Sequence, residues 1–361
     1  MVEKLTTSVA EIEQQARGLL PPELFERWFG SRHDPLWQTN FNNVDGFDQL
    51  YLRPRVLAAD PDVDMSTTVL GQSVSFPVYL APVGSQTRFH PDGELASARA
   101  AKAAGTVFSI SFGSSFSIDE IRAVTDGPLF FQLYVLKDRG LVAEIVKRAE
   151  HADCSALIIT VDQPGTRTRE RDDANSLRMD RQPPKLATNT SAYGNLRGTG
   201  INTSEDLIAA EEPLLNWSVV DWLRELTSMP IVLKGIQTPE DARLAADHGA
   251  TAIVVSNHGG HSLSGAYPTI LSLPEIVDAV GDRLEIHVDG GVRRGTDVLK
   301  AVAVGARAVA IGRGTYWGLA VGGEQGVQTV LDVLNEELYL ACMFCSVPNV
   351  RQADRSLLRL P

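Results

Sequence analysis

From about residue 76 to residue 313, the chain repeats one unit, a short apolar run of β-forming residues followed in most cases by a helical stretch. The runs are continuously apolar rather than alternating, which is typical of parallel strands buried on both faces. Eight such runs predict an α/β protein whose strands close into a (β/α)8 TIM barrel. The runs are 78–83, 107–112, 129–135, 156–162, 231–235, 252–257, 285–291 and 308–313. The expected helices include 93–104, 140–152, 239–248 and 295–304.

A doubly wound sheet is the structural alternative, but no glycine-rich dinucleotide fingerprint follows the first run. We therefore predict one barrel domain over 1–361, with 1–75 as an N-terminal helical segment. Residues 20–29 predict a helix with proline in its first turn, which we expect to cap one end of the barrel. Residues 169–216, after the fourth run, are polar and irregular and predict a mobile loop at the active site.

Charge and composition exclude several classes of partner. The formal net charge is −12 and the sequence pI is about 5.1. Nucleic acid and anionic membranes are disfavoured, because both need a basic surface. No apolar run reaches the roughly 20 residues of a membrane span, and the first residues lack a signal-peptide pattern. We therefore expect a cytoplasmic protein that acts on a small molecule.

The chain has three cysteines, Cys154, Cys342 and Cys345. A small odd number is typical of a reducing compartment. Cys342 and Cys345 have C-x-x-C spacing in an apolar, helix-forming segment without a second pair. This favours core packing, with a redox or metal role as the alternative, and we predict no metal site.

The sixth apolar run ends in Ser256-Asn257-His258-Gly259-Gly260-His261. Strand ends carry the chemistry of such barrels, and histidine is suited to accept a proton near neutral pH. Asp162 ends the fourth run, and its carboxylate is the expected partner that would stabilise a protonated His258. The other histidines, including His287, show no comparable motif and are interpreted as structural or exposed.

The seventh run is followed by Asp289-Gly290-Gly291-Val292-Arg293-Arg294-Gly295, and the eighth ends in Ile311-Gly312-Arg313-Gly314. Glycine amides and arginines after the last two strands predict a phosphate site. Lys234 ends the fifth run, where it needs a neighbouring anion and could stabilise charge on a reduced cofactor. Tyr134 ends the third run and could bind a substrate oxygen or simply pack.

These segments, with Gln132-Leu133-Tyr134 and Val232-Leu233-Lys234-Gly235, resemble the FMN-dependent 2-hydroxy acid oxidases and dehydrogenases over nearly the whole chain. The resemblance implies that FMN lies across the carboxyl mouth of the barrel. The phosphate would bind Gly291, Arg293, Gly312 and Arg313, beside Asp289. The isoalloxazine ring would contact Pro82, Val83 and Gly84. Polar groups for the cofactor would come from Ser111, Gln132, Thr160, Lys234 and Ser256.

The resemblance also implies that His258 takes the substrate proton, that Asp162 supports the imidazolium and that Tyr134 binds the substrate. The reduced flavin would pass its electrons to O2 or another acceptor. A homotetramer is the implied assembly.

The departures from the family pattern lie on the substrate side. The family arginine that grips the substrate carboxylate is His261 here, and the following Gln-Leu-Asp reads Ser262-Leu263-Ser264. The family's N-terminal tyrosine aligns with Arg27, and an aromatic residue after the second strand aligns with Gly113. Losing a bidentate arginine–carboxylate contact in a buried site is not a conservative change.

Two readings follow. Either Arg27 or a loop arginine (Arg167, Arg169 or Arg171, with Arg169 the best candidate) holds the carboxylate of a conventional 2-hydroxy acid, or the substrate has no free carboxylate. The room left by Gly113 and Ser262 favours the second reading, with an amide, ester, sugar, larger alcohol or amine as substrate. A non-redox isomerase and a catalytically silent FMN-binding protein are further alternatives, and the His258–Asp162 pair argues against the isomerase.

Overall fold

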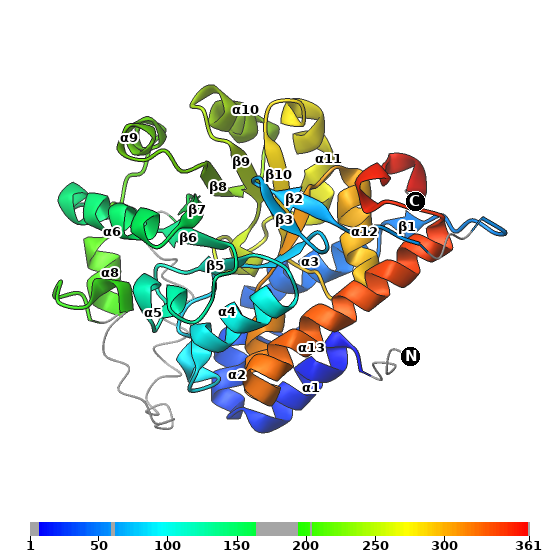
Figure 1. The fold of residues 1–361 in the computed structure, drawn as a ribbon, viewed down its shortest axis with the longest axis horizontal. Coiled ribbons are helices and arrows are strands. Elements are labelled where there is room, and N and C mark those ends of the chain that lie inside the picture. Colours follow the sequence, from blue (N-terminus) through cyan, green and yellow to red (C-terminus); the bar gives the residue numbers. More distant parts are fainter. Residues whose placement is uncertain (1–6, 59–61, 164–193, 203, 360–361) are drawn as a thin grey trace.

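The computed structural model describes residues 7–58, 62–163, 194–202 and 204–359. Eight parallel strands close into a barrel with helices arranged around it (Figure 1), which confirms the (β/α)8 prediction. Each predicted run overlaps one barrel strand. These are β4 (Val78–Leu80), β5 (Phe108–Ile110), β6 (Leu129–Leu133), β7 (Cys154–Thr160), β8 (Ile231–Ile236), β9 (Ala252–Val255), β10 (Glu285–Asp289) and β11 (Ala308–Ile311).

The barrel closes between its last and first strands, where Ile311 on β11 pairs with Leu80 on β4. All eight strands are parallel, so their carboxyl ends share one mouth. The residues singled out after the apolar runs therefore converge there.

The apolar runs serve two cores, one on each face of the barrel wall. Small and branched side chains such as Ala156, Ile158 and Val254 fill the interior together with the rings of Tyr79 and Phe130. The alternate residues, such as Leu80, Ile110 and Leu157, pack outward against the helices. Burial on both faces explains why the runs show no alternation.

A hairpin closes the amino end of the barrel, and sequence analysis did not single it out. It consists of β2 (Thr67–Val69) and β3 (Gln72–Val74). Val69 and Val74 join the interior core, and the backbone N–H of Leu70 donates to Oε1 of Glu285 at 2.8 Å.

The surrounding helices begin at recognisable caps. Asp138 accepts from the backbone N–H of Leu141 at 3.0 Å, and Thr238 accepts from that of Asp241 at 3.2 Å, ahead of Pro239. The helices around the barrel are α4 (Gly93–Ala103), α5 (Ile118–Arg122), α6 (Arg139–His151), α8 (Ser204–Ala210), α9 (Ser218–Leu226), α10 (Pro239–Asp247), α11 (Thr269–Val280), α12 (Gly295–Val304) and α13 (Arg313–Cys345). None of the helices in the described ranges is long and apolar enough to cross a membrane.

The N-terminal segment forms α1 (Val9–Leu19), α2 (Pro22–Phe29) and α3 (Gln38–Phe47). The helix expected at 20–29 is α2. Its Phe29 packs beside Phe89 and Trp317, with ring centroids 5.8 and 5.7 Å away. It thus lies against the chain after β4 and the start of α13, on the carboxyl side. A two-stranded sheet, β1 (Tyr51–Leu52) with β12 (Leu358–Arg359), ties the segment to the C-terminal end.

The expected irregular loop over 169–216 needs a correction. Residues 169–193 lie outside the described residues, but 204–210 form helix α8. Leu207 is buried, and the backbone N–H of Lys137 donates to the carbonyl of Ala210 at 2.9 Å. These tertiary contacts hold a helix that the local sequence pattern does not reveal.

Candidate functional site

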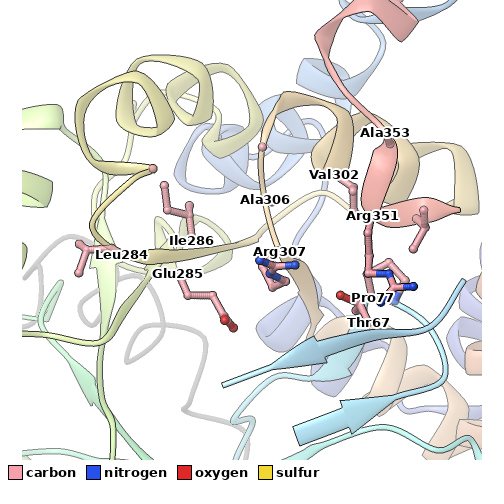
Figure 2. A pocket seen from close by; sticks show the side chains of 13 residues that line it. Thr67, Pro77, Leu284, Glu285, Ile286, Val302, Ala306, Arg307, Arg351 and Ala353 are labelled. Atoms are coloured by element: carbon pink, nitrogen blue, oxygen red, sulfur yellow. The ribbon is translucent and has the colours of Figure 1, made fainter. Parts of the chain in front are cut away.

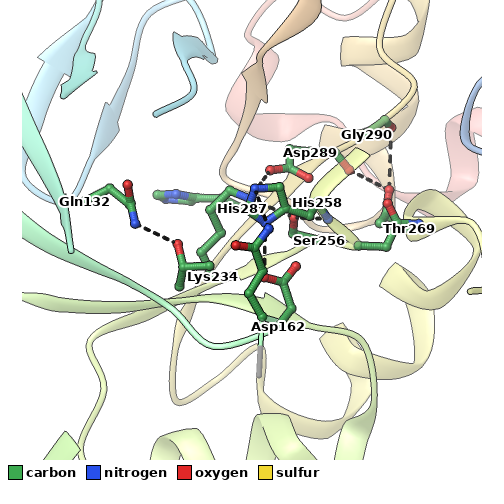
Figure 3. A network of polar contacts seen from close by, with 12 residues as sticks. Gln132, Asp162, Lys234, Ser256, His258, Thr269, His287, Asp289 and Gly290 are labelled. Carbon is green, nitrogen blue, oxygen red and sulfur yellow. Dashed lines mark hydrogen bonds and ion pairs between the residues drawn. The ribbon is translucent and has the colours of Figure 1, made fainter. Parts of the chain in front are cut away.

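His258 lies just past β9, in a short 3-10 helix spanning His258–Gly260. Its Nδ1 lies 3.1 Å from Oδ1 of Asp162, which follows β7 (Figure 3). Strand β8 runs between the two residues. Glycine is needed at position 235 of this strand, because an added Cβ would lie only 2.5 Å from the Cβ of Asp162. His258 has a φ of 56°, and its N–H donates to Oγ of Ser256 at 3.1 Å. The fold thus brings the expected pair together.

The two side chains of this pair differ in exposure. The Asp162 carboxylate is 5% exposed and the His258 imidazole 24%. Burial opposes ionisation of Asp162, but the charge of His258, their hydrogen bond and the charge of Lys234 outweigh it and lower the pKa of Asp162. An ionised Asp162 accepts Nδ1–H and leaves Nε2 as the proton acceptor. Nε2 lies 3.5 Å from the side-chain nitrogen of Gln163.

Lys234 is buried on β8, which continues to Ile236 rather than ending at Lys234 as expected. Its Nζ lies 3.1 Å from Oδ2 of Asp289 and donates to Oγ of Ser256 at 3.0 Å (Figure 3). Burial would lower the pKa of Lys234, but the charges of Asp289 and Asp162 raise it. A positive charge therefore lies beside the His258–Asp162 pair, and Asp289 is the neighbouring anion that the sequence predicted for Lys234.

A buried amide links three neighbouring strands at the mouth. Oε1 of Gln132 accepts from the N–H of Phe112 at 3.0 Å and from Oγ of Ser111 at 3.3 Å. Its Nε2 donates to Oγ1 of Thr160 at 3.0 Å. These bonds fix the amide orientation, so the three polar residues expected at the cofactor edge lie together.

Gly291, after β10, touches the N-terminal segment. Its φ is 89°, and a Cβ at this position would overlap the backbone carbonyl of Asn43 on α3. Asn43 in turn exchanges two 2.8 Å amide hydrogen bonds with Asn257, next to His258. Sequence analysis did not predict this contact, because 214 residues separate Asn43 from Asn257. Asn43 belongs to no motif, and Asn257 was quoted only as a member of the segment around His258.

Two arginines follow the last two strands. Arg293 stacks over Trp317, with Cζ 4.7 Å from the ring centroid, and donates to the carbonyl of Val292 at 2.9 Å. Burial lowers the pKa of the Arg293 guanidinium. Arg313 donates to the carbonyl of Gly259 at 2.7 Å, joining the first residue of α13 to the 3-10 helix after β9. Gly312 lies directly before it.

The residues expected at the flavin ring and substrate also lie at the mouth. Pro82, Val83 and Gly84 are half-buried after β4, and Tyr316 donates to the carbonyl of Gly84 at 2.7 Å. Tyr134 is half-buried after β6, and its ring lies edge-on to Phe112 with centroids 6.0 Å apart.

The residues considered in place of the family arginine differ from one another in position and exposure. His261 is half-buried, with its ring edge-on to Trp37 at a centroid distance of 5.0 Å and 6.3 Å from that of His258. Arg27 is exposed on α2, whereas its neighbour Trp28 packs against Tyr316 with centroids 5.3 Å apart. Arg167, Arg169 and Arg171 lie outside the described residues.

The described residues fit a cofactor with a polar-edged ring and a phosphate. Adjacent strands supply a buried amide, hydroxyls and a lysine, and glycines and arginines follow the last two strands. Oδ1 of Asp289 is buried and accepts no hydrogen bond within the described ranges. A buried acceptor of this kind suits a hydroxyl of the cofactor.

Comparison with known proteins agrees with this arrangement. The family model for FMN-dependent dehydrogenases matches residues 16–360. The chain is 41% identical to 2-hydroxyacid oxidase 1 of Mus musculus over 359 residues, which is 97% of this chain and 96% of the relative. It is 40% identical to glycolate oxidase of Spinacia oleracea over 354 residues, covering 97% and 95%.

Solved structures of mandelate oxidase share the fold. One superposes with a TM-score of 0.85 at 40% identity, covering 98% of this chain and 97% of that one. Another, an arginine-to-leucine variant with 2-hydroxy-phenylacetamide, gives a TM-score of 0.84 at 39% identity with the same coverage. The chain therefore belongs to the FMN-dependent dehydrogenase family and is an FMN-dependent oxidoreductase of the 2-hydroxy acid oxidase type.

Proposed function

We propose that this enzyme oxidises a carbon bearing a hydroxyl or amino group, with His258 as the base. The observation that carries the proposal is the 3.1 Å contact between His258 and Asp162. The carboxylate is buried while the imidazole is partly exposed at the mouth, so a substrate meets Nε2.

FMN, when bound, supplies the acceptor for the two electrons that leave the substrate carbon. His258 accepts the substrate proton at Nε2, and ionised Asp162 stabilises the imidazolium. Lys234 would supply a positive charge that stabilises the negative charge of the reduced cofactor. Tyr134 hydrogen-bonds a substrate oxygen.

We assign the remaining cofactor contacts to the residues named from the sequence. Pro82, Val83 and Gly84 would lie under the ring, and Gly291, Arg293, Gly312 and Arg313 would hold the phosphate. The other polar contacts would come from Ser111, Gln132, Thr160, Ser256 and Asp289. Their positions around one mouth support this assignment.

We further propose that the substrate has no free carboxylate. Support comes from His261, whose imidazole lacks the bidentate fork of arginine. One solved mandelate oxidase variant, substituted at a position other than that of His261, is found with 2-hydroxy-phenylacetamide, the amide of a 2-hydroxy acid. Amides of this type are therefore the first compounds to test.

The alternative is a conventional 2-hydroxy acid whose carboxylate is held by Arg27 or a loop arginine such as Arg169. The names of the relatives, 2-hydroxyacid oxidase and glycolate oxidase, favour it. The exposure of Arg27 on α2 weighs against Arg27 itself.

The test is anaerobic reduction of the purified protein, followed by loss of flavin absorbance. Free 2-hydroxy acids are offered beside their amides and esters, sugars and amines. Bleaching by carboxylate-free compounds alone supports the proposed substrate class. Bleaching by free acids supports the alternative, and Arg27→Ala with full activity on them would exclude Arg27 as the carboxylate clamp. A flavin that no compound bleaches would favour a silent FMN-binding protein or an isomerase.

O2 is the proposed electron acceptor, because the named relatives are oxidases.

A homotetramer and a cytoplasmic location are also proposed. An exposed apolar patch supports assembly, since the N–H of Arg55 donates to the carbonyl of Phe344 and brings Val56 and Leu57 beside Phe344. Sedimentation of the holoenzyme tests the assembly, and a monomer would contradict it.

A further inference from the structure

The short turn that carries His258 has a constrained backbone. His258, Gly259 and Gly260 have φ angles of 56°, 60° and 82°, all in the left-handed region that favours glycine. A histidine adopts such a conformation only where the surrounding groups hold it there. The direction of the imidazole, and with it the contact to Asp162, therefore depends on what fixes this turn.

Asn257, the residue before the turn, supplies part of the support. Its Oδ1 accepts from the N–H of Gly260 at 3.2 Å, and its Nδ2 donates to the carbonyl of Tyr267 at 3.1 Å. An N–H only donates and a carbonyl only accepts, so these two bonds give the amide of Asn257 a single orientation. The side chain is fully buried. Asn257 thus bridges the end of the turn to the segment that follows it.

Asn43 on α3 completes the hydrogen bonding of that amide. Its Nδ2 donates to Oδ1 of Asn257, and its Oδ1 accepts from Nδ2 of Asn257, both at 2.8 Å. Oδ1 of Asn43 also accepts from the N–H of Thr269 at 3.2 Å, which fixes the orientation of this second amide. Asn43 is fully buried as well, so the loss of either bond leaves a buried polar group without its partner.

The backbone of α3 lies close to two loops at the mouth. An added Cβ at Gly260 would lie 2.6 Å from the backbone nitrogen of Asn40, and one at Gly291 would lie 2.2 Å from the carbonyl oxygen of Asn43. Helix α3 therefore contacts both the turn that carries His258 and the loop after β10 that we assign to the FMN phosphate.

We propose that Asn43 is a positioning residue for the oxidation: through Asn257 it holds the left-handed turn in the conformation that presents Nε2 of His258 to the substrate. Asn43 takes no part in the transfer of protons or electrons. The inference rests on the proposed role of His258 as the base. It gives the N-terminal segment, which lies outside the eight strand–helix units, a part in completing the site.

The test begins with Asn43→Ala in the FMN-loaded enzyme, which removes both bonds to Asn257. We expect kcat to fall roughly 10–100-fold with little change in KM, because a misplacement of about 1 Å can lower a rate on the order of 100-fold. Steady-state kinetics on a substrate identified by the anaerobic panel measures both constants. If Asn43→Ala does not retain FMN, Asn43→Ser replaces it, since the shorter side chain cannot span the Asn257 amide, and an unchanged kcat then overturns the proposal.

A double-variant cycle shows whether Asn43 acts through Asn257. Asn257→Ala should also lower kcat, and Asn43→Ala/Asn257→Ala should be no worse than Asn257→Ala alone, because the two amides act as one unit. Losses that multiply in the double variant would mean that the two residues act independently, which overturns the proposal.

Hydrogen exchange supplies a readout that needs no turnover. The backbone amides of the turn, above all that of Gly260, should exchange faster in Asn43→Ala than in the wild type, since their acceptor on Asn257 is no longer held. Mass spectrometry of peptides that cover residues 256–265 measures the exchange. An unchanged exchange rate there overturns the proposal, whatever the activity.

Asn40→Ala is the matched control. Asn40 is a buried asparagine one turn earlier on α3, and its Nδ2 donates to the carbonyl of Phe29 at 3.2 Å. The truncation leaves the backbone of Asn40 beside Gly260. We expect neither the fall in kcat nor the faster exchange of the turn. The same changes in Asn40→Ala would assign the effect to the docking of α3 in general and overturn the role of Asn43.

Glu285→Gln is a second control, at the amino end of the barrel. Glu285 begins β10, accepts from the N–H of Leu70 at 2.8 Å and lines a surface pocket of about 210 Å³ with Arg307 and Arg351 (Figure 2). The change weakens a contact of the strand that leads to Gly291 but leaves α3 untouched, so exchange of the turn should equal that of the wild type. An increase as large as in Asn43→Ala would overturn the assignment.

Asp162→Asn separates this inference from the proposed function. A fall in kcat in Asp162→Asn but not in Asn43→Ala leaves the base in place and refutes the positioning role. An unchanged kcat in both variants, with faster exchange of the turn in Asn43→Ala, refutes His258 as the base and the positioning role with it.

Discussion

Nδ1 of His258 lies 3.1 Å from Oδ1 of Asp162, across the strand that separates β7 from β9. The carboxylate is the buried partner and its pKa is lowered, so it is charged when His258, as the proposed base, accepts a proton. Because the pKa of Asp162 is lower in the folded state than its usual value of 3.8, this pairing stabilises the fold at pH values above 3.8. The stabilisation is lost as the pH falls through the lowered value.

Asp162→Asn keeps the shape of the side chain and removes its charge. We expect kcat to fall roughly 10²–10⁴-fold with little change in KM, because the imidazolium loses its stabilising carboxylate. Steady-state kinetics on a substrate identified by the anaerobic panel checks this. Asp221→Asn is the control, since Asp221 makes a similar 2.9 Å contact to His248 on the outer helices. Equal losses in both variants would contradict a catalytic role for Asp162.

Lys234→Met leaves the carboxylate of Asp289 buried without its cation. Breaking such a pair typically costs about 3–5 kcal/mol of unfolding free energy. The double variant Lys234→Met/Asp289→Asn removes both charges and should recover most of that loss. Chemical denaturation of the FMN-free protein measures both values. A double variant less stable than the single one would show that the ion pair is not the source of the effect.

Gly291→Ala tests the close approach between the loop after β10 and helix α3. The new Cβ would overlap the carbonyl of Asn43, in addition to the strain of a φ of 89°. Gly71→Ala carries similar strain at φ 78° with no atom within 4 Å, so it should cost only roughly 1–2 kcal/mol. We expect Gly291→Ala to cost more than this in thermal or chemical unfolding and to weaken FMN binding. Equal costs would mean that the contact with Asn43 is unimportant.

The sequence predicted the barrel and most of the mouth because those features are local. The apolar run 252–257 and the motif around His258 can each be recognised from neighbouring residues alone. Because the strands of the barrel are parallel, their carboxyl ends then meet at one mouth. The pairing of Asp162 with His258 follows from that geometry. Helix α8 and the β2–β3 hairpin were missed, since tertiary contacts such as those of Leu207 and Val69 hold them.

The contact between Tyr79 and His287 inside the barrel could not be read from the sequence for a similar reason. Tyr79 and His287 are 208 residues apart, and only closure of the barrel brings β4 close to β10, with β11 between them. Neither residue belongs to a motif, so His287 was interpreted as structural or exposed. The structure shows that it is buried and hydrogen-bonded at both nitrogens.

The cysteines should be inert in the folded protein. All three are buried and unpaired, and burial raises the pKa of Cys154 and of Cys342 to about 12. The C-x-x-C pair lies within α13, and both of its cysteines are buried in the hydrophobic core, which favours packing. We expect no alkylation near pH 8 and three modified thiols per chain after unfolding, measured by mass spectrometry. Rapid labelling of Cys342 in the native protein would contradict this prediction and support a redox role for the C-x-x-C pair.

His261→Arg tests the proposed change of substrate class. His261 is half-buried against Trp37 and 6.3 Å from His258, so an arginine there would bring its guanidinium to the substrate side of the mouth. A bidentate contact with a carboxylate should raise kcat/KM for free 2-hydroxy acids roughly 10–100-fold, because charged hydrogen bonds contribute about 1.5–3 kcal/mol. The same change should lower kcat/KM for amides, which leave the new charge without a partner. His261→Gln, which adds no charge, should show neither effect. A wild type that already oxidises free acids well, with no gain in His261→Arg, would place the carboxylate grip elsewhere and make a conventional 2-hydroxy acid the substrate.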